Sequence, residues 1–250
     1  MNRPERLNAM TNPMMESMAE VLADLANDSS VRAVILAGEG RAFCAGGDVS
    51  AMGGSDGKVT GGGTPIDEQV KHQRQIHRSS HLLHTMGKPT VAVVQGAAVG
   101  AGLSLALACD LRVGGESARM GTAFARVGLA GDFGGTYFLT KIVGPAKARE
   151  LYFSAEILNA QQCLELGLLT KVVADADLRA AGNEFAQRLA SGPSVAFAYM
   201  KRNLNLAMHS DAQTVLDSEA ELHRKTGLTQ DHAEAAKAFV EKREPVFHGR

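Results

Sequence analysis

Apolar residues follow two patterns along the first half of the chain. Runs of valine, isoleucine and alanine at residues 31–38 and 90–96 are typical of buried strands, whereas residues 11–29 repeat apolar positions at the spacing of an amphipathic helix. The predicted elements, in order, are a helix at 11–29, a strand at 31–38, a glycine-rich mobile loop at 53–65, a helix at 67–86, a strand at 90–96, a turn at 97–102, a helix at 103–110 and a strand at 111–116. Because short strands alternate with helices, we expect the strands to pair in parallel.

From Pro145 onward the pattern is mainly helical. Asn159 and Gln162 are placed as a capping box, in which each side chain bonds the backbone N–H of the other residue. The predicted helices lie at 145–153, 159–167, 175–191, 194–209, 211–226 and 231–243. The sequence therefore predicts the α/β class with a helical C-terminal region.

Residues 90–109 carry no charge and are about long enough to cross a bilayer. The segment is mostly alanine, glycine and valine, however, and it contains Gln95. It also divides into a β-rich half and an alanine- and leucine-rich half around its glycines. We therefore expect a buried strand, a turn and a helix here, and no membrane association.

The composition excludes some classes of function. The chain has 250 residues, of which 45% are hydrophobic and 21% charged, and its net charge of −1 gives no basic surface for nucleic acid. Cys44, Cys109 and Cys163 lie far apart, at neither zinc-ligand nor disulfide spacing. The N-terminal residues contain no apolar run like that of a signal peptide. We expect a cytoplasmic protein with no metal site.

Two glycine-rich loops each follow a predicted strand and precede a helix. They are "FCAGGD" at residues 43–48 and "GAAVGAG" at residues 96–102. Small residues let backbone N–H groups approach a ligand, so one N–H from each loop is suited to form an oxyanion hole. Tight turns and helix–strand packing explain the same residues. A dinucleotide-binding fingerprint does not explain these residues, because Gly96, Gly100 and Gly102 do not have the spacing of that motif.

Three histidines, His77, His81 and His84, fall on one face of the predicted helix at 67–86. A solvated or partly packed helix face is the favoured interpretation, because a metal site usually adds a carboxylate. One of the three histidines lining a pocket is the alternative.

One carboxylate, Asp132, lies in the otherwise uncharged segment "VGLAGDFGGTY" at residues 127–137. Asp-x-Gly-Gly is a good turn sequence, which favours a structural role. A functional role needs a pocket, in which Leu129, Phe133 and Tyr137 would partly desolvate the carboxylate and raise its pKa toward neutrality.

Five segments of the chain resemble the crotonase, or enoyl-CoA hydratase/isomerase, superfamily. They are "NRPERLNAM", "RAFCAGGDVSAM", "GKPTVAVVQGAAVGAGLSLALACDLRV", "GPAKARELYFSAEILNAQQCLELGLLTKVV" and "AFVEKR". The resemblance implies a spiral of ββα units at residues 1–190 and a C-terminal helical trimerisation region at residues 191–250. It also implies a homotrimer or hexamer that acts on an acyl-CoA thioester, with coenzyme A as part of the substrate and no separate cofactor.

The resemblance also implies site residues. The oxyanion hole falls on the backbone N–H groups of Gly47 and Ala101, which would hold the thioester oxygen as an enolate forms. Lys242 is a cation suited to a phosphate and is expected to serve a neighbouring subunit. The implied substrate contacts are Arg6, Leu7, Ala45, Gly46, Asp48, Val49, Phe124, Phe239 and Lys242.

The sequence departs from the hydratases of this superfamily at both of their catalytic glutamates. The resemblance puts the first at Ser104 and the second at Phe124. Without this carboxylate pair, addition of water has no evident acid and base. Hydration by Asp132 alone, or by a carboxylate at another position, stays an alternative.

Another branch, the enoyl-CoA isomerases and the ring-opening isomerases of epoxide-derived acyl-CoA, has its acid in a G-L-x-x-D/E-x-G-G segment. "VGLAGDFGG" resembles it and makes Asp132 the catalytic carboxylate, so we predict an enoyl-CoA isomerase. Aryl-CoA dehalogenases have a nucleophilic aspartate at this place and a histidine that matches His77. Dehalogenation or hydrolysis, and acyl-CoA binding without catalysis, stay further alternatives.

Overall fold

The computed structural model describes residues 1–48 and 64–250. Val49 and most of the glycine-rich loop predicted at 53–65 lie outside the described residues. Among the described residues, no helix has both the length and the apolar character needed to cross a bilayer.

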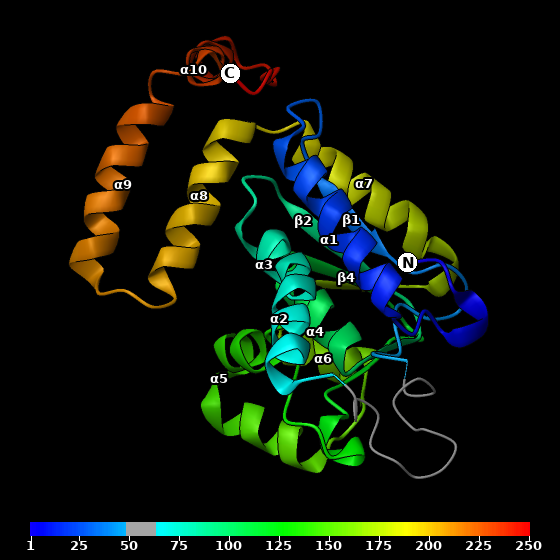
Figure 1. Ribbon diagram of the computed structural model, residues 1–250. Coiled ribbons are helices and arrows are strands. Elements are labelled where there is room, and N and C mark those ends of the chain that lie inside the picture. The colour runs from blue at the N-terminus through cyan, green and yellow to red at the C-terminus, as the bar shows by residue number, and fades with distance from the viewer. Residues whose placement is uncertain (49–63) are drawn as a thin grey trace.

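A four-stranded parallel sheet forms the centre of the fold (Figure 1). Its strands are β1 (Val34–Ala37), β2 (Thr90–Val94), β4 (Leu111–Gly115) and β7 (Lys171–Val173), in the order β1-β2-β4-β7. Every residue of β2 is buried, as expected for a strand that is covered on both faces. The predicted parallel pairing of the first three strands is confirmed.

Helices cover both faces of this sheet. On one face α7 (Leu178–Ala190) contacts β2, while α1 (Asn12–Asn27) and α3 (Arg78–Thr85) belong to the larger core on the other. Alternate residues of β2 point to opposite faces, as the period of a strand requires. The residues packed under α7 are Val91, Val93, Val113, Leu178 and Ala186.

A second, three-stranded sheet contains β3 (Ala97–Val99), β5 (Arg119–Gly121) and β6 (Leu158–Asn159). The predicted turn at 97–102 is therefore wrong over its first three residues. These residues pair in parallel with β5, about twenty positions later, and such a partner leaves no local signal. The next helix, α4 (Ala101–Ala108), begins two residues earlier than predicted and is buried all round.

The helix predicted at 67–86 is two helices, α2 (Ile66–Ile76) and α3, which meet at His77. The 3-10 helices are η1 (Pro4–Arg6), η3 (Phe124–Val127) and η4 (Asp175–Asp177). Helix α5 (Gly135–Ser154) bends at Gly144, whose φ is 77°, just before Pro145.

The capping box at the start of α6 (Ala160–Glu165) is confirmed. The Gln162 N–H donates to Asn159 Oδ1 at 3.0 Å, and the Asn159 N–H donates to Gln162 Oε1 at 2.9 Å. This motif was predictable because all of its groups lie within four residues.

Helices α8 (Ser194–Ala207), α9 (Ala212–Thr226) and α10 (Gln230–Glu241) extend away from the sheets, with α10 at the opposite end from α5 (Figure 1). Their large exposed apolar residues are Met200, Leu204, Leu216, Phe239 and Val240. Helix α7 ends at Ala190, and the division into regions 1–190 and 191–250 stays a prediction.

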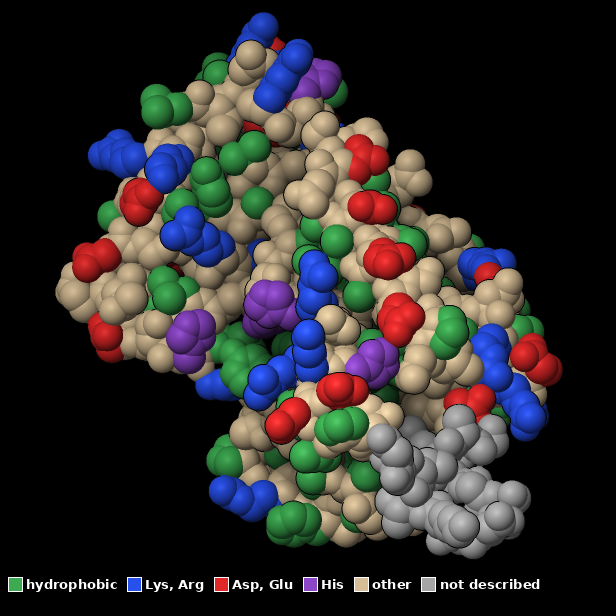
Figure 2. Space-filling model, viewed as in Figure 1, with side chains coloured by type: hydrophobic (Ala, Val, Ile, Leu, Met, Phe, Trp, Pro, Cys, Tyr) green, Lys and Arg blue, Asp and Glu red, His purple; other side chains and the backbone are tan. Residues whose placement is uncertain are grey.

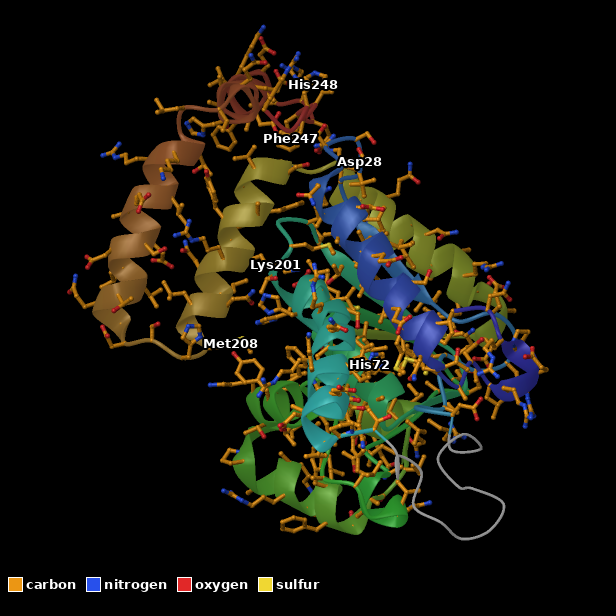
Figure 3. All side chains as sticks on the ribbon, in the orientation of Figure 1. Asp28, His72, Lys201, Met208, Phe247 and His248 are labelled. Atoms are coloured by element: carbon orange, nitrogen blue, oxygen red, sulfur yellow. The ribbon has the colours of Figure 1, made fainter. Side chains whose placement is uncertain are left out.

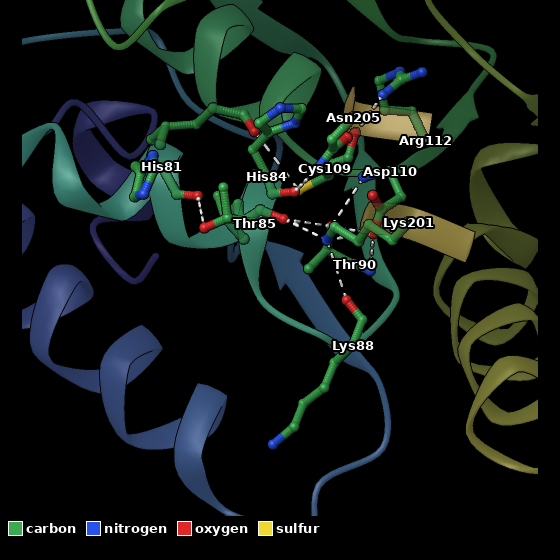
Figure 4. A network of polar contacts seen from close by, with 12 residues as sticks. His81, His84, Thr85, Lys88, Thr90, Cys109, Asp110, Arg112, Lys201 and Asn205 are labelled. Atoms are coloured by element: carbon green, nitrogen blue, oxygen red, sulfur yellow. Dashed lines mark hydrogen bonds and ion pairs between the residues drawn. The ribbon is translucent and has the colours of Figure 1, made fainter. Parts of the chain in front are cut away.

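Lys201 fixes α8 to the core (Figures 3 and 4). Its buried Nζ donates to Asp110 Oδ2 at 2.8 Å, to the Leu83 carbonyl at 2.8 Å and to the Lys88 carbonyl at 3.2 Å. Burial lowers the Lys201 pKa, and the charge of Asp110 offsets part of that effect. This ion pair and the Asn205 amide, which donates to the His84 carbonyl at 2.8 Å, attach α8 to the core.

Candidate active site

The two glycine-rich loops lie against each other. The Cys44 N–H donates to the Ala97 carbonyl at 2.9 Å, and the Val99 N–H donates to the Cys44 carbonyl at 2.9 Å. A Cβ added at Gly102 would lie 2.3 Å from the Cys44 carbonyl oxygen, so no larger residue fits this approach. A Cβ at Gly46, which has a φ of 96°, would lie 3.0 Å from the Val99 carbonyl oxygen.

This packing leaves the N–H groups of Gly47 in the first loop and Ala101 in the second without a partner among the described residues. Gly47 forms a parallel bridge with Met10, in which the Met10 N–H donates to Gly46 and the Asp48 N–H donates to Met10, so the Gly47 N–H faces the other way. Ala101 is the first residue of α4, where N–H groups have no intrahelical acceptor. Its nitrogen is 3.7 Å from a Cβ built at Gly46. Both N–H groups are available to an anionic oxygen.

The Asp132 carboxylate is held by side chains from α2 and its junction with α3. The Gln73 amide nitrogen donates to Oδ1 at 2.8 Å and to Oδ2 at 3.0 Å. His77 Nε2 contacts Oδ1, and the Phe133 N–H donates to the same oxygen at 2.9 Å. An ionised carboxylate only accepts, so this set of donors suits the charged form. The partners are 59 and 55 residues away, which a turn former alone does not require.

The expected apolar shell around Asp132 is only partly present. Phe133 is buried, and its ring centroid lies 5.1 Å from that of His77. Leu129 and Tyr137 are 51% and 38% exposed, so the prediction that they enclose the carboxylate is wrong. The segment turns before α5 begins, and these two side chains point outward.

Ser104 and Phe124 are both buried beside the second glycine loop. The Ser104 hydroxyl donates to the Gly100 carbonyl at 3.2 Å. The Phe124 ring is stacked on Tyr152, with 6.1 Å between centroids and 7° between planes, and it lies 3.9 Å from a Cβ built at Gly100. Burial and then the charge of Asp132 raise the Tyr152 pKa to about 12. Tyr152 thus lies between Phe124, which packs near Gly100, and the segment that contains Asp132.

The three histidines do not form one site. His77 contacts Asp132, His81 is exposed, and His84 packs its ring against Phe138 with 5.2 Å between centroids. Burial is the main cause that lowers the His84 pKa. Within the described ranges, no group of three histidines, cysteines or carboxylates is placed to hold a metal ion.

The implied substrate contacts divide into two groups. Leu7 adjoins the first loop, because the Ala45 N–H donates to its carbonyl at 3.0 Å, and exposed Arg6 precedes it. Asp48 contacts Arg3 at 3.0 Å. Phe239 and Lys242, in contrast, lie at the far end of the molecule on α10 and its C-cap (Figure 1).

Sequence reasoning missed Gln73 and Tyr152. Gln73 precedes His77 by four residues, the spacing that puts two helical residues on one face, so this signal was readable. Tyr152 is 20 residues after Asp132 and reaches it only because α5 folds back past α4.

The family profile described as enoyl-CoA hydratase/isomerase matches residues 1–250. The chain belongs to the enoyl-CoA hydratase/isomerase family. Its fold is that of the crotonase superfamily, with TM-score 0.90 and 30% identity to the crystal structure of an enoyl-CoA hydratase from a Polaromonas species, covering 98% of this chain and 93% of that one. The predicted superfamily and fold class are confirmed.

The relatives in this family include both isomerases and hydratases. The chain is 34% identical over 250 residues to the 1,2-epoxyphenylacetyl-CoA isomerase of Escherichia coli K12, covering 100% of this chain and 94% of that protein. It is also 34% identical over 243 residues to the short-chain-enoyl-CoA hydratase of Clostridium acetobutylicum, covering 97% and 90%. These comparisons support an acyl-CoA enzyme of the enoyl-CoA hydratase/isomerase family and do not choose between its two reactions.

Proposed function

We propose that the chain is an enoyl-CoA isomerase in which Asp132 moves a proton between two carbons of the acyl chain. The observation that carries this proposal is the set of contacts that Gln73, His77 and the Phe133 N–H make with one carboxylate. These contacts hold the carboxylate in one orientation, which is what a group that transfers a proton requires. The chain is 34% identical both to the Escherichia coli isomerase and to the Clostridium acetobutylicum hydratase, so the choice of isomerisation rests on the site and not on these relatives.

The reaction balances with one carboxylate. Asp132 removes a proton from C2 of a 3-enoyl thioester, and the electron pair delocalises to the thioester oxygen as a dienolate. The N–H groups of Gly47 and Ala101 donate to that oxygen, each contributing about 3 kcal/mol to transition-state stabilisation. Asp132 then returns the proton to C4, which gives the 2-enoyl thioester.

Hydration is disfavoured by the residues at the two positions of the hydratase glutamates. Ser104 is buried and donates to the Gly100 carbonyl, while Phe124 is an apolar ring stacked on Tyr152. Neither side chain deprotonates water, and the buried rings of Phe124 and Phe133 suit a site from which water is excluded.

The surface beside this site suits a coenzyme A thioester. Figure 2 shows basic side chains gathered over α2 and α3, whose exposed members are Lys71, Arg74 and Arg78. Cations on the helices that carry Gln73 and adjoin His77 attract a phosphate-bearing substrate. We assign coenzyme A to the substrate, with no separate cofactor.

Phe239 and Lys242 lie on α10 and its C-cap, at the opposite end of the molecule from α5 (Figure 1). We therefore assign Phe239 and Lys242 to the substrate of a neighbouring subunit in a homotrimer or hexamer. We also propose that the protein is cytoplasmic. The exposed apolar residues of α8 to α10 support such an assembly.

The direct test compares wild-type and Asp132→Asn proteins on trans-3-hexenoyl-CoA. We expect the variant to lose at least about 10²-fold in kcat, the usual size of a lost acid–base group. Asp177→Asn, at an exposed aspartate whose side chain forms no cap bond to α7, is the matched control and should keep full activity. Unchanged turnover by Asp132→Asn refutes the proposal.

The contact between Asp132 and His77 favours a second candidate, a dehalogenase or hydrolase of aryl-CoA thioesters. Asp132 would attack the aromatic carbon and expel halide, and His77 would activate the water that cleaves the resulting ester. Halide release from 4-chlorobenzoyl-CoA, with ¹⁸O from labelled water entering Asp132, would establish this candidate. The absence of both rejects it.

A further inference from the structure

Tyr152 extends its side chain from α5 back to the segment that carries Asp132. A Cβ built at Gly135 would lie 2.8 Å from the Tyr152 hydroxyl oxygen and 2.2 Å from the Ser104 hydroxyl oxygen. A Cβ built at Gly131 would lie 3.8 Å from the Tyr152 hydroxyl oxygen. The hydroxyl therefore lies where residues 131–135 meet α4, and Asp132 belongs to that segment.

The ring of Tyr152 has a fixed orientation. It is stacked on Phe124 with only 7° between the ring planes, and Phe124 in turn packs near Gly100 in the second glycine loop. The phenol hydroxyl is thus held at a constant position relative to the Ala101 N–H and the Asp132 carboxylate. A donor fixed in this way is suited to distinguish between ligands.

The Tyr152 hydroxyl has no hydrogen-bond partner in the part of the chain that the structure describes. The Ser104 hydroxyl, which also lies against Gly135, donates instead to the Gly100 carbonyl. With its pKa raised to about 12, the phenol keeps its proton at neutral pH and is a donor. A donor that stays unpaired against an apolar ligand costs binding free energy, so the site favours a ligand with an acceptor there.

We propose that Tyr152 determines specificity by donating a hydrogen bond to an oxygen substituent on the acyl chain, within two bonds of the carbon that Asp132 reprotonates. The preferred substrates are acyl-CoA thioesters with an ether, hydroxyl or epoxide oxygen at this position. The inference rests on the proposed function. Tyr152 keeps its own proton throughout and takes no part in the proton transfer.

The binding test uses two unreactive thioesters that differ by one atom. In 5-methoxypentanoyl-CoA an ether oxygen replaces one CH₂ group of heptanoyl-CoA. Calorimetry on the wild-type protein should give a Kd for the ether about fivefold to tenfold lower than for heptanoyl-CoA. Tyr152→Phe, which keeps the ring stacked on Phe124, should bind both thioesters equally.

Two controls separate specificity from structure. Tyr137→Phe, on the same helix with its hydroxyl 3.8 Å from Met208 Sδ, should keep the wild-type preference for the ether. Equal binding of both thioesters by the wild-type protein overturns the inference. A Tyr152→Phe variant that raises the Kd of both thioesters by the same factor also overturns the inference, because that result indicates the loss of a structural contact and not of a specific hydrogen bond.

Kinetics on the matching 3-enoyl thioesters separate this inference from the proposed function. Wild-type kcat/KM should favour 5-methoxy-3-pentenoyl-CoA over 3-heptenoyl-CoA, and Tyr152→Phe should remove that preference while it leaves the heptenoyl value unchanged. If neither thioester is isomerised but the binding preference depends on Tyr152, the proposed function fails and the specificity inference stands.

Discussion

Gln73 donates its amide to both oxygens of Asp132, at 2.8 and 3.0 Å. A donor shared between the two oxygens fixes the plane of the carboxylate as well as its position. Because His77 contacts only Oδ1, Oδ2 is the oxygen left more open to a substrate carbon. The geometry of the pair therefore sets which oxygen can exchange a proton.

Gln73→Leu should lower kcat about tenfold and leave KM nearly unchanged. Leucine fills a similar volume but cannot orient the carboxylate, and misalignment of a reacting group slows chemistry more than it weakens binding. Steady-state kinetics on trans-3-hexenoyl-CoA measure both constants. Gln75→Leu, at an exposed position of α2, is the control. A rise in KM with constant kcat would show that Gln73 contacts the substrate instead.

His77→Ala should lower kcat, whereas His77→Gln should restore most of the activity. The proposed role of His77 is to donate one hydrogen bond to Asp132, and a glutamine amide can supply that donor. A histidine that activates water cannot be replaced in this way, because an amide is no base. If His77→Gln is as inactive as His77→Ala, the histidine is a base and the nucleophilic candidate gains.

Gly46→Ala should lower kcat about 10²-fold. The added Cβ would lie 3.0 Å from the Val99 carbonyl and near the Ala101 nitrogen, so the two loops must separate and one oxyanion donor is misplaced. Gly144→Ala is the matched control, because it also has a positive φ but its Cβ would meet nothing within 4 Å. Equal activity losses in both variants would attribute the effect to backbone strain alone.

Lys201→Met should lower the free energy of unfolding by about 2–4 kcal/mol, because it leaves Asp110 without its cation in a partly buried site. Urea unfolding followed by circular dichroism measures the change. Lys225→Met removes an exposed pair with Glu221 and should change stability little. Equal effects of the two substitutions would contradict the anchoring role of Lys201.

Sequence patterns predicted those parts of the fold that depend on neighbouring residues. The Asn159–Gln162 capping box and the buried β2 strand are examples, since propensity and burial act over a few positions. The strand at Ala97–Val99 was not predicted, because it is only three residues long and its partner β5 is distant in the sequence.

In the candidate site, too, the sequence predicted the features that depend on neighbouring residues and not those that depend on distant ones. Its glycine loops and Asp132 were identified by motif, and Gln73 was readable from its spacing to His77. The outward orientation of Leu129 and the approach of Tyr152 depend on how the chain turns into α5, which no local pattern encodes.

The central claim is that Asp132 transfers a proton within the acyl chain and does not add water. The most direct measurement is the mass and double-bond position of the product formed from trans-3-hexenoyl-CoA in H₂¹⁸O. The account predicts 2-hexenoyl-CoA of unchanged mass from the wild-type protein and at least a hundredfold slower formation by Asp132→Asn. A wild-type protein that leaves trans-3-hexenoyl-CoA unchanged but adds ¹⁸O-labelled water to trans-2-hexenoyl-CoA would contradict it.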